Sequence, residues 1–382
     1  MRSSAADTTR LCILTPHHST TLPGGAEYQI DCLLNVLTPL KRYEIYYLAG
    51  IVAETSAGHP YQLLQIGRSR HAPRFGYLTQ AVPLYRLLRR LLPDVIYQRV
   101  ACGYTGVAAY YARRHGARLV WHVAHDTDVT PQGSLDGRNP VRRFLEKRSV
   151  EYAIGRADCI VAQTTHQARL LELHYRRAPD AIIPNFHPQP QEPIDKSGPL
   201  RVVWVASLKP FKHPEIFVRL AAALQDRADT RFVMIGPQAG GSGIQGWSDS
   251  LLQSIRATPN IDYLGPQSQA EVNRVLASAH LFVNTSRYEG FPNTFIQAWM
   301  RDAVVVSLSV DPDELLSRRA LGIYCEGCEQ RLHEQVRALL ANPALRTQLA
   351  QRARSYANCA HSLANAQALV QLLDRRTCPQ RR

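Results

Sequence analysis

Two loops in the second half of the chain carry the residue types and spacing best suited to chemistry on an anionic ligand. Residues 285–300 read Thr-Ser-Arg-Tyr-Glu-Gly-Phe-Pro-Asn-Thr-Phe-Ile-Gln-Ala-Trp-Met and follow an apolar, strand-like run. Pro292 stands where proline is tolerated in the first turn of a helix, so that helix would direct its unpaired N–H groups and its dipole toward Glu289. A hydrogen-bonding carboxylate beside an anion-binding helix start suits a sugar hydroxyl next to a diphosphate.

The second loop, at residues 205–215, offers two lysines directly after another strand-like run. It reads Val-Ala-Ser-Leu-Lys-Pro-Phe-Lys-His-Pro-Glu, which places Lys209 and Lys212 between a predicted strand and the helix after it. A lysine at a strand end can lie against a phosphate as a point charge. Surface lysines are common, but Pro210 and Pro214 restrict this backbone, which favours an anchored loop.

The first half of the chain offers weaker candidates at two predicted strand ends. Residues 23–27 read Pro-Gly-Gly-Ala-Glu and open a helical pattern, and Gly24 and Gly25 would let the backbone approach an anion there. A Gly-Gly loop is also common in ordinary tight turns. His125 follows an apolar run and is a candidate for substrate contact, whereas His122, within that run, is expected to be a hydrogen-bonded core histidine.

Short runs rich in Val, Ile and Leu alternate with longer amphipathic stretches along almost the whole chain. This alternation predicts an α/β fold built from βαβ units with parallel sheets, in which ligands bind beyond the carboxyl ends of the strands. Four prolines interrupt the pattern at 185–199. We therefore predict two doubly wound, Rossmann-like domains at 1–187 and 200–360, a linker at 188–199, and a C-terminal helix and tail at 361–382 that packs back on the first domain. The expected strands are 11–15, 43–48, 94–98, 118–124, 159–162, 181–183, 201–206, 231–235, 261–264, 281–284 and 304–307.

The charge is strongly basic, with 45 Lys and Arg against 31 Asp and Glu and a net charge of +14. Basic clusters lie mostly in the first half. The segment 77–92 combines several leucines with Arg86, Arg89 and Arg90, which predicts an amphipathic helix with a basic face. Such a helix suits contact with an anionic membrane surface, and a plain solvated face explains it equally well. Nucleic acid is not expected as a partner, because no recognised binding module accompanies the charge.

The composition is that of a folded chain of 382 residues with 45% hydrophobic residues, and no apolar run approaches the roughly 18 residues of a membrane span. Residues 1–10 are polar and lead into only a short apolar stretch, so a secretory signal is not expected. The eight cysteines are scattered, and the pair Cys325 and Cys328 lacks the second pair that a structural zinc usually needs. We expect a cytoplasmic protein, at most peripheral on the inner face of the cell membrane.

Together these segments resemble the family 4 retaining glycosyltransferases of the GT-B fold, over nearly the whole chain. The resemblance rests on Gly24-Gly25-Ala26-Glu27, His125, Ile183-Pro184-Asn185, Lys212, and an E-x7-E signature that opens at Glu289. It implies two Rossmann-like domains that face each other across a cleft. It also implies a hexosyltransferase-like enzyme that moves a sugar from a nucleoside-diphosphate sugar to a glycan or lipid-linked acceptor with retention, in the assembly of surface polysaccharide or glycolipid.

The resemblance also assigns roles to residues. Those implied for catalysis are Glu289, Lys212 and His125, and no metal ligand or cofactor is expected, because the lysines and backbone amides would stabilise the departing diphosphate. The residues implied for donor binding are Gly24, Gly25, Lys209, Gly290, Phe291, Pro292, Asn293, Thr294 and Gln297.

Two positions depart from the family pattern. Gln297 stands where the second glutamate of E-x7-E would accept hydrogen bonds from the donor ribose, and Ser207 stands where an arginine usually accompanies the phosphate lysine. Gln can still accept one hydrogen bond but without charge assistance, which weakens donor binding by about 1–2 kcal/mol. Two alternatives therefore remain open: a non-catalytic binding or scaffold protein, and a sugar-nucleotide epimerase that needs no acceptor.

Overall fold

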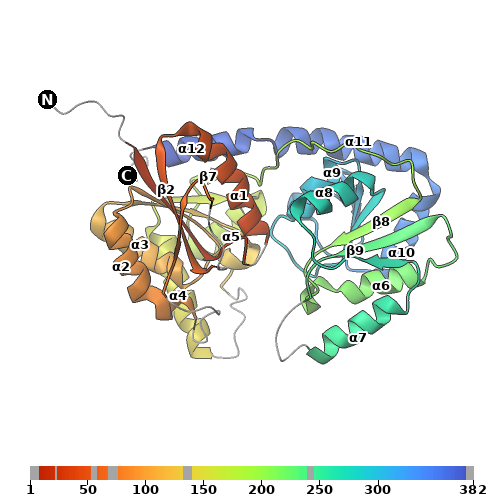
Figure 1. The fold of residues 1–382 in the computed structure, drawn as a ribbon, viewed down its shortest axis with the longest axis horizontal. Coiled ribbons are helices and arrows are strands. Elements are labelled where there is room, and N and C mark those ends of the chain that lie inside the picture. The colour runs from red at the N-terminus through yellow and green to blue at the C-terminus, as the bar shows by residue number, and fades with distance from the viewer. Residues whose placement is uncertain are drawn as a thin grey trace. The chain divides into compact units, whose positions relative to one another are not determined.

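The computed structural model describes residues 8–21, 24–52, 58–67, 76–131, 140–238 and 245–375. The chain forms two compact units: unit 1 comprises Met1–Phe186 and Leu363–Arg382, and unit 2 comprises His187–Ser362. Each unit contains one parallel sheet with helices on both faces (Figure 1). Pro23, the first residue of the predicted Gly-Gly loop, lies outside the described residues.

Unit 1 is built on a seven-stranded sheet in the order β3-β2-β1-β4-β5-β6-β7, with every neighbouring pair parallel. The order reverses between β1 and β4, as in doubly wound folds. The strands are β1 (Thr9–His17), β2 (Tyr43–Ile51), β3 (Gln62–Gln65), β4 (Val95–Arg99), β5 (Arg118–His122), β6 (Cys159–Ala162) and β7 (Ala181–Ile182).

The helices of unit 1 cover its sheet in two layers, because successive strand residues point to opposite faces. Leu11 and Ile13 pack in the cluster with α1 and α12, whereas Cys12 and Leu14 pack in the cluster with α2, α3 and α4. The last helix of the chain thus returns to unit 1 and lies beside its first helix. The helices are α1 (Gly25–Leu37), α2 (Ala81–Leu91), α3 (Gly103–His115), α4 (Pro140–Arg156), α5 (Thr165–Tyr175) and α12 (Ala364–Asp374).

Unit 2 is built on a six-stranded parallel sheet in the order β10-β9-β8-β11-β12-β13. Its strands are β8 (Leu200–Val205), β9 (Thr230–Ile235), β10 (Ile261–Tyr263), β11 (Leu281–Asn284), β12 (Val304–Ser307) and β13 (Gly322–Tyr324). Its helices are α6 (Pro214–Ala222), α7 (Gln245–Arg256), α8 (Gln269–Ser278), α9 (Asn293–Trp299), α10 (Glu329–Ala341) and α11 (Pro343–Ala360).

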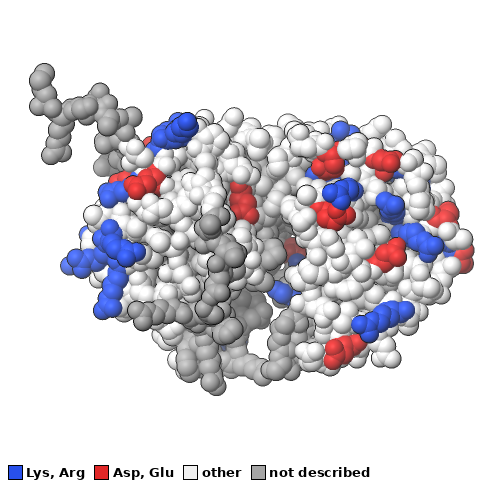
Figure 2. All heavy atoms as spheres, in the orientation of Figure 1, with Lys and Arg blue, Asp and Glu red and all other residues white. Residues whose placement is uncertain are grey.

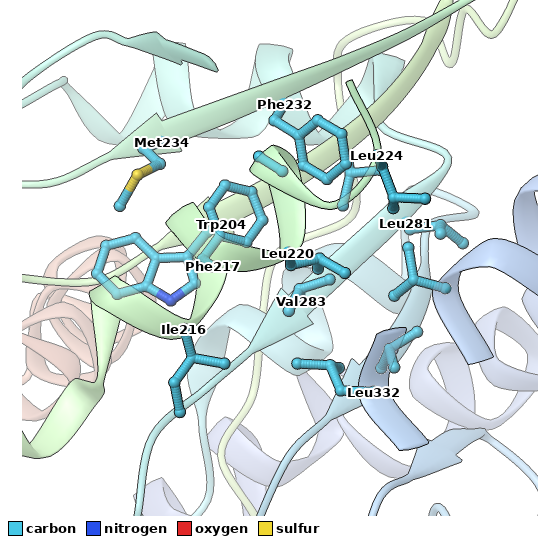
Figure 3. Packing of buried hydrophobic residues seen from close by; sticks show 14 of the residues in the cluster. Trp204, Ile216, Phe217, Leu220, Leu224, Phe232, Met234, Leu281, Val283 and Leu332 are labelled. Carbon is cyan, nitrogen blue, oxygen red and sulfur yellow. The ribbon is translucent and has the colours of Figure 1, made fainter. Parts of the chain in front are cut away.

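The core of unit 2 lies on both faces of its sheet. On one face Trp204 and Phe232 belong to one cluster with Phe217 of α6 and Leu332 of α10, and the rings of Phe217 and Phe232 lie with centroids 5.7 Å apart (Figure 3). On the other face Val203 packs with residues of α8, α9 and α11. Successive side chains of β8 are therefore buried on opposite faces of the sheet, which explains why this strand is a continuous apolar run in the sequence.

The proline-rich segment 187–199 belongs to unit 2. The N–H of Asp195 donates to the carbonyl of Ala277 at 3.3 Å, and the ammonium of Lys196 contacts the carbonyl of Ala279. These contacts hold the segment against the end of α8.

The observed elements follow the expected alternation, although several predicted strands begin or end one to three residues away from the observed ones. The predicted strand 118–124 ends at His122, and the predicted helix 77–92 begins as a short 3-10 helix, η2 (Tyr77–Gln80), before α2. The strands β3 and β13 were not predicted, because both are short strands at a sheet edge without a long apolar run. Among the helices of the described residues, none combines the length and the hydropathy that a bilayer span requires.

Candidate functional site

The candidate residues of unit 2 lie where β8 and β11 run side by side in its sheet. The helix after β8 packs on one face of the sheet and the helix after β11 packs on the other. This point is the topological switch of the sheet, where open parallel sheets bind ligands beyond their carboxyl ends. The loops after the two strands therefore meet at the edge where a ligand is expected.

The lysine loop is fixed to the sheet by backbone hydrogen bonds. The N–H of Leu208 donates to the carbonyl of Pro237 at 2.9 Å, which prolongs the pairing of β8 with β9 beyond the strand ends. Residues Pro210–Lys212 form a single 3-10 turn, η4, closed by the N–H of Lys212 on the carbonyl of Lys209 at 2.9 Å. His213 then takes a left-handed backbone conformation (φ 47°), from which α6 begins.

Side chains and backbone groups tie this loop to the loop after β11. The indole N–H of Trp204 donates to Oγ1 of Thr285 at 2.9 Å, and Thr285 in turn donates to the carbonyl of Lys212 at 2.6 Å. The N–H of Arg287 donates to the carbonyl of Phe211 at 2.9 Å. Thr285 and Trp204 were not predicted as site residues, because neither a hydroxyl directly after a strand nor an indole within an apolar run gives a functional signal in the sequence.

The two loops meet at an ion pair between Lys212 and Glu289, in which Nζ contacts Oε1. Both side chains are only 16% exposed, so the pair is screened less than an ion pair in open water. Beside it, the rings of Phe211 and Tyr288 stack with centroids 5.2 Å apart, and Nζ of Lys212 lies 5.1 Å from the Phe211 centroid. The structure thus brings together the lysine and the carboxylate that the sequence marked separately.

The residues after Glu289 form the start of α9. Gly290, Phe291 and Pro292 are buried, while Asn293 and Thr294 are half-buried. The ring of Phe291 packs against His361 with centroids 4.7 Å apart, so this residue anchors the loop in the core.

Gln297 lies in the middle of α9 and is 2% exposed. Its side-chain Nε2 donates to Oδ1 of Asn273 on α8 at 3.4 Å, and its backbone carbonyl accepts from Arg301 at 3.1 Å. At Ser207 the backbone carbonyl accepts from the N–H of Lys209 at 2.8 Å. Ser207 therefore helps to shape the lysine loop through its backbone.

In unit 1, Gly24 and Gly25 lie at the start of α1, after the carboxyl end of β1. Gly24 is the N-cap residue, and its carbonyl accepts from the N–H of Tyr28 at 2.9 Å. A Cβ atom at Gly24 would lie 2.5 Å from the carboxylate of Glu27, so the absence of a side chain lets this carboxylate fold back over the helix start.

His125 follows the end of β5 and caps the 3-10 helix η3 (Asp126–Val129). Its Nδ1 accepts from the N–H of Thr127 at 3.1 Å, and the carboxylate of Asp128 accepts from the N–H of His125 at 3.0 Å. His122 is fully buried and its Nδ1 lies 2.9 Å from the hydroxyl of Tyr97, which confirms the predicted core role. Gly24 follows β1 and His125 follows β5, and β4 lies between these two strands in the sheet. Both residues therefore lie at the edge formed by the carboxyl ends of the strands.

A cluster that the sequence analysis missed lies directly after β1. Nε2 of His18 lies 2.9 Å from the hydroxyl of Tyr61, and its ring centroid lies 5.3 Å from that of His59. Burial lowers the pKa of His18 to about 4, and burial raises the pKa of the nearby Asp31, which accepts from Ser19 at 3.2 Å. The same strand-end reasoning that selected His125 would have found His18.

The cysteine pair with metal-like spacing lies in unit 2. Cys325 is buried, and burial raises its pKa to about 12, whereas Cys328 is exposed. Within the ranges that the structure describes, no group of three or more His, Cys, Asp or Glu side chains is placed to hold a metal ion.

Two family models match the chain, one for each sheet. Residues 199–342 match the model described as glycosyl transferases group 1, and residues 34–186 match the model described as glycosyl transferase 4-like domain. The D-inositol 3-phosphate glycosyltransferase of Mycobacterium leprae is 25% identical over 222 residues, which cover 54% of this chain and 51% of the relative. The chain thus spans about half the length of the curated relatives it matches.

Solved structures share the fold at low sequence identity. HepE from Anabaena, in complex with UDP and glucose, has a TM-score of 0.74 and 17% identity, with 96% of this chain and 99% of that chain covered. WaaG, a glycosyltransferase involved in lipopolysaccharide biosynthesis, has a TM-score of 0.74 and 15% identity over the same shares. Since the two family models together cover more than three quarters of the chain, the protein belongs to the group 1 and 4-like glycosyltransferases and has their GT-B fold.

Proposed function

We propose that the protein transfers a hexose-type sugar from a nucleoside-diphosphate sugar to a glycan or lipid-linked acceptor, with retention of configuration. The observation that carries this proposal is the Lys212–Glu289 pair at the switch point of the unit 2 sheet. A cation and a carboxylate held together at this edge suit a ligand that presents a diphosphate beside sugar hydroxyls.

In this mechanism the glycosidic C–O bond breaks and negative charge grows on the departing diphosphate. Lys212 and Lys209 stabilise that charge, together with backbone amides at residues 290–294, so no metal ion is required. Glu289 accepts hydrogen bonds from hydroxyls of the donor sugar, and Gln297 faces the ribose. His125, Gly24 and Gly25 contribute from unit 1. The acceptor oxygen forms the new C–O bond on the face that the diphosphate leaves, and the hydroxyl proton passes to an oxygen of the departing diphosphate.

The relatives guide the choice of ligands. HepE is described with UDP and glucose, and the curated relatives are named D-inositol 3-phosphate glycosyltransferases. UDP is therefore the first nucleotide to test. WaaG is described as involved in lipopolysaccharide biosynthesis, which supports a role in the assembly of surface polysaccharide or glycolipid. We place this role at the inner face of the cell membrane.

The test is the melting temperature of the purified protein with UDP, GDP, ADP and their sugars, because a ligand of the folded state raises it by mass action. We expect one base to give the largest rise and Lys212→Ala to abolish that rise. Arg256→Ala removes one positive charge from an exposed position of α7 in the same unit, and it should leave the rise intact. If no nucleotide shifts the wild-type protein, the non-catalytic scaffold replaces the transferase as the better proposal.

A further inference from the structure

One face of unit 1 carries an open groove that the candidate site does not use. It lies among α2, α3 and α4 and has a volume of about 720 Å³. Its lining is mostly apolar, and four apolar side chains that line it are 38–56% exposed: Val82, Tyr110, Leu145 and Tyr152. On α4, Val141 and Phe144 are also exposed, at 64% and 62%. Clustered exposed apolar side chains of this kind mark contact with an apolar partner.

Close packing of the helices forms the floor of the groove. The hydroxyl of Ser149 donates to the carbonyl of Gly103 at 2.9 Å, and a Cβ atom at Gly106 would lie 2.2 Å from that hydroxyl. Glycine therefore lets α3 and α4 approach closely. On α2, Leu84 and Leu88 are fully buried against the sheet, which leaves the opposite side of this helix to form the rim.

The rim of the groove is basic. Arg86, Arg89 and Arg148 line it, and Figure 2 shows positive side chains gathered over the region of α2. Neither α2 nor α3 contains an acidic residue, and on α4 Glu151 pairs with Arg148 and Lys147. Within the described residues, no carboxylate lies at ion-pair distance from Arg86 or Arg89.

We propose that this surface docks on a bilayer of anionic phospholipid, with acyl chains in the apolar groove and phosphate headgroups on the arginine rim. Exposed aromatic and aliphatic side chains enter the interface region of a bilayer, and arginine side chains reach the phosphates above it. The docking extends the proposed function, because it places the enzyme where a lipid-linked acceptor lies, but it does not depend on the donor site of unit 2.

Other occupants fit the groove less well. A symmetric contact with a second copy of this chain would bring Arg86 and Arg89 toward like charges without compensating carboxylates. Nucleic acid would account for the arginines but not for the exposed apolar side chains on α4. A protein helix with acidic and apolar side chains would offer the groove the same kinds of group as an anionic bilayer, and the experiment below distinguishes these two partners.

The test uses the full chain with Tyr110→Trp as a reporter at the groove. Vesicles contain phosphatidylcholine alone or with phosphatidylglycerol, and their acyl chains carry bromine, which quenches an indole that reaches them. Trp121, Trp204 and Trp299 are at most 2% exposed, and Trp247 of α7 is half-buried in unit 2. The wild-type protein, which contains these four tryptophans but not the reporter, is therefore measured in parallel as the background. We expect quenching only with the anionic lipid, and it should weaken as salt increases. Binding without quenching, or no binding to anionic vesicles, would overturn the proposal, and the second result would favour the protein partner.

Charge reversal tests the rim. In Arg86→Glu/Arg89→Glu we expect at least a tenfold loss of affinity for anionic vesicles. The matched control is Arg256→Glu/Arg352→Glu, which changes the net charge equally at exposed positions of unit 2 and should bind as the wild type does. If both double variants lost the same affinity for anionic vesicles, the effect would depend on net charge alone, and this result would overturn the proposed docking surface.

The apolar groove is tested by Val82→Gln/Leu145→Gln, which keeps every charge. We expect this double variant to bind anionic vesicles several-fold more weakly than the wild type. When the two exchanges are combined with Tyr110→Trp, the brominated lipid should no longer quench the reporter. Unchanged quenching would contradict a lipid-filled groove. In all of these variants the rise in melting temperature with UDP should equal that of the wild type, so failure of the docking proposal and failure of the proposed function give different results.

Discussion

At the scale of single residues, the pairing of Lys212 with Glu289 determines what the candidate site can do. The two residues are 77 positions apart in the sequence. Their loops could be predicted, since each follows an apolar strand. Their contact could not, because only the sheet order makes β8 and β11 neighbours. In the proposed function, the carboxylate holds the ammonium at the edge of the sheet before a diphosphate binds, which lowers the entropy cost of ordering the lysine side chain.

This pairing predicts opposite effects on binding and turnover when the carboxylate is neutralised. In Glu289→Gln the charge of Lys212 is no longer balanced, so UDP should bind at least as tightly as in the wild type. Transfer should fall about 10- to 100-fold, because a charge-assisted hydrogen bond to the donor sugar contributes about 1.5–3 kcal/mol. Calorimetric titration and a turnover assay measure the two effects. The control Glu329→Gln breaks a surface pair with Arg219 and should alter neither. Loss of UDP binding in Glu289→Gln would show instead that the carboxylate mainly holds the loop.

Gln297 allows a gain-of-function prediction. A carboxylate at this position would accept from ribose hydroxyls with charge assistance, and Asn273 can rotate its amide to donate to the new oxygen. Gln297→Glu should therefore strengthen UDP binding up to about tenfold. The same exchange at the exposed Gln253 of α7 is the control. Weaker binding in Gln297→Glu would mean that the buried position rejects a charge.

At the scale of elements, apolar runs predicted most strands because parallel strands are buried on both faces. What they could not predict is the close approach of backbones. Gly236, after β9, has a φ of 149°, and a Cβ atom there would lie 1.7 Å from the carbonyl oxygen of Ala206. This approach sets the distance between β9 and the first residues of the lysine loop.

Gly236→Ala should therefore act on stability and on the site together. The clash is with backbone rather than with a flexible side chain, so we expect a loss of about 3 kcal/mol in the free energy of unfolding. The displaced lysine loop should also weaken UDP binding. Urea titration and calorimetry measure both quantities. At Gly246, exposed at the start of α7 with open space around it, the same exchange should leave stability equal or slightly higher. An unchanged free energy for Gly236→Ala would mean that β9 shifts at little cost.

At the scale of the whole molecule, the described residues form two hydrophobic core clusters within unit 1 and two within unit 2. The sequence could indicate two sheets through the break at residues 185–199. It could not indicate which sheet receives α12, because an amphipathic helix shows that a face is buried but not against what. The contacts of α12 with α1 supply that answer.

Both units contain histidines that burial keeps neutral. Burial lowers the pKa of His18 in unit 1 and of His187 and His280 in unit 2 to about 4, and it holds that of His122 well below its usual range. In the unfolded chain these histidines titrate near pH 6.5, so between pH 6.5 and pH 4 the unfolded chain binds more protons than the folded one. Their contribution to stability is present above pH 6.5 and is lost as the pH falls toward 4.

We therefore expect the free energy of unfolding to decrease over this range, by about 1–2 kcal/mol for each fully buried histidine. His187→Asn provides the specific test, because its amide can replace the contact of Nδ1 with the carbonyl of Pro188 but does not titrate. The slope of stability against pH, measured by urea titration, should become shallower in this variant. At the exposed His174 of α5 the same exchange should leave the slope unchanged. An equal slope in His187→Asn would mean that acid acts on unit 2 through other groups, such as the carboxyl of Glu329, whose pKa is lowered by Arg219.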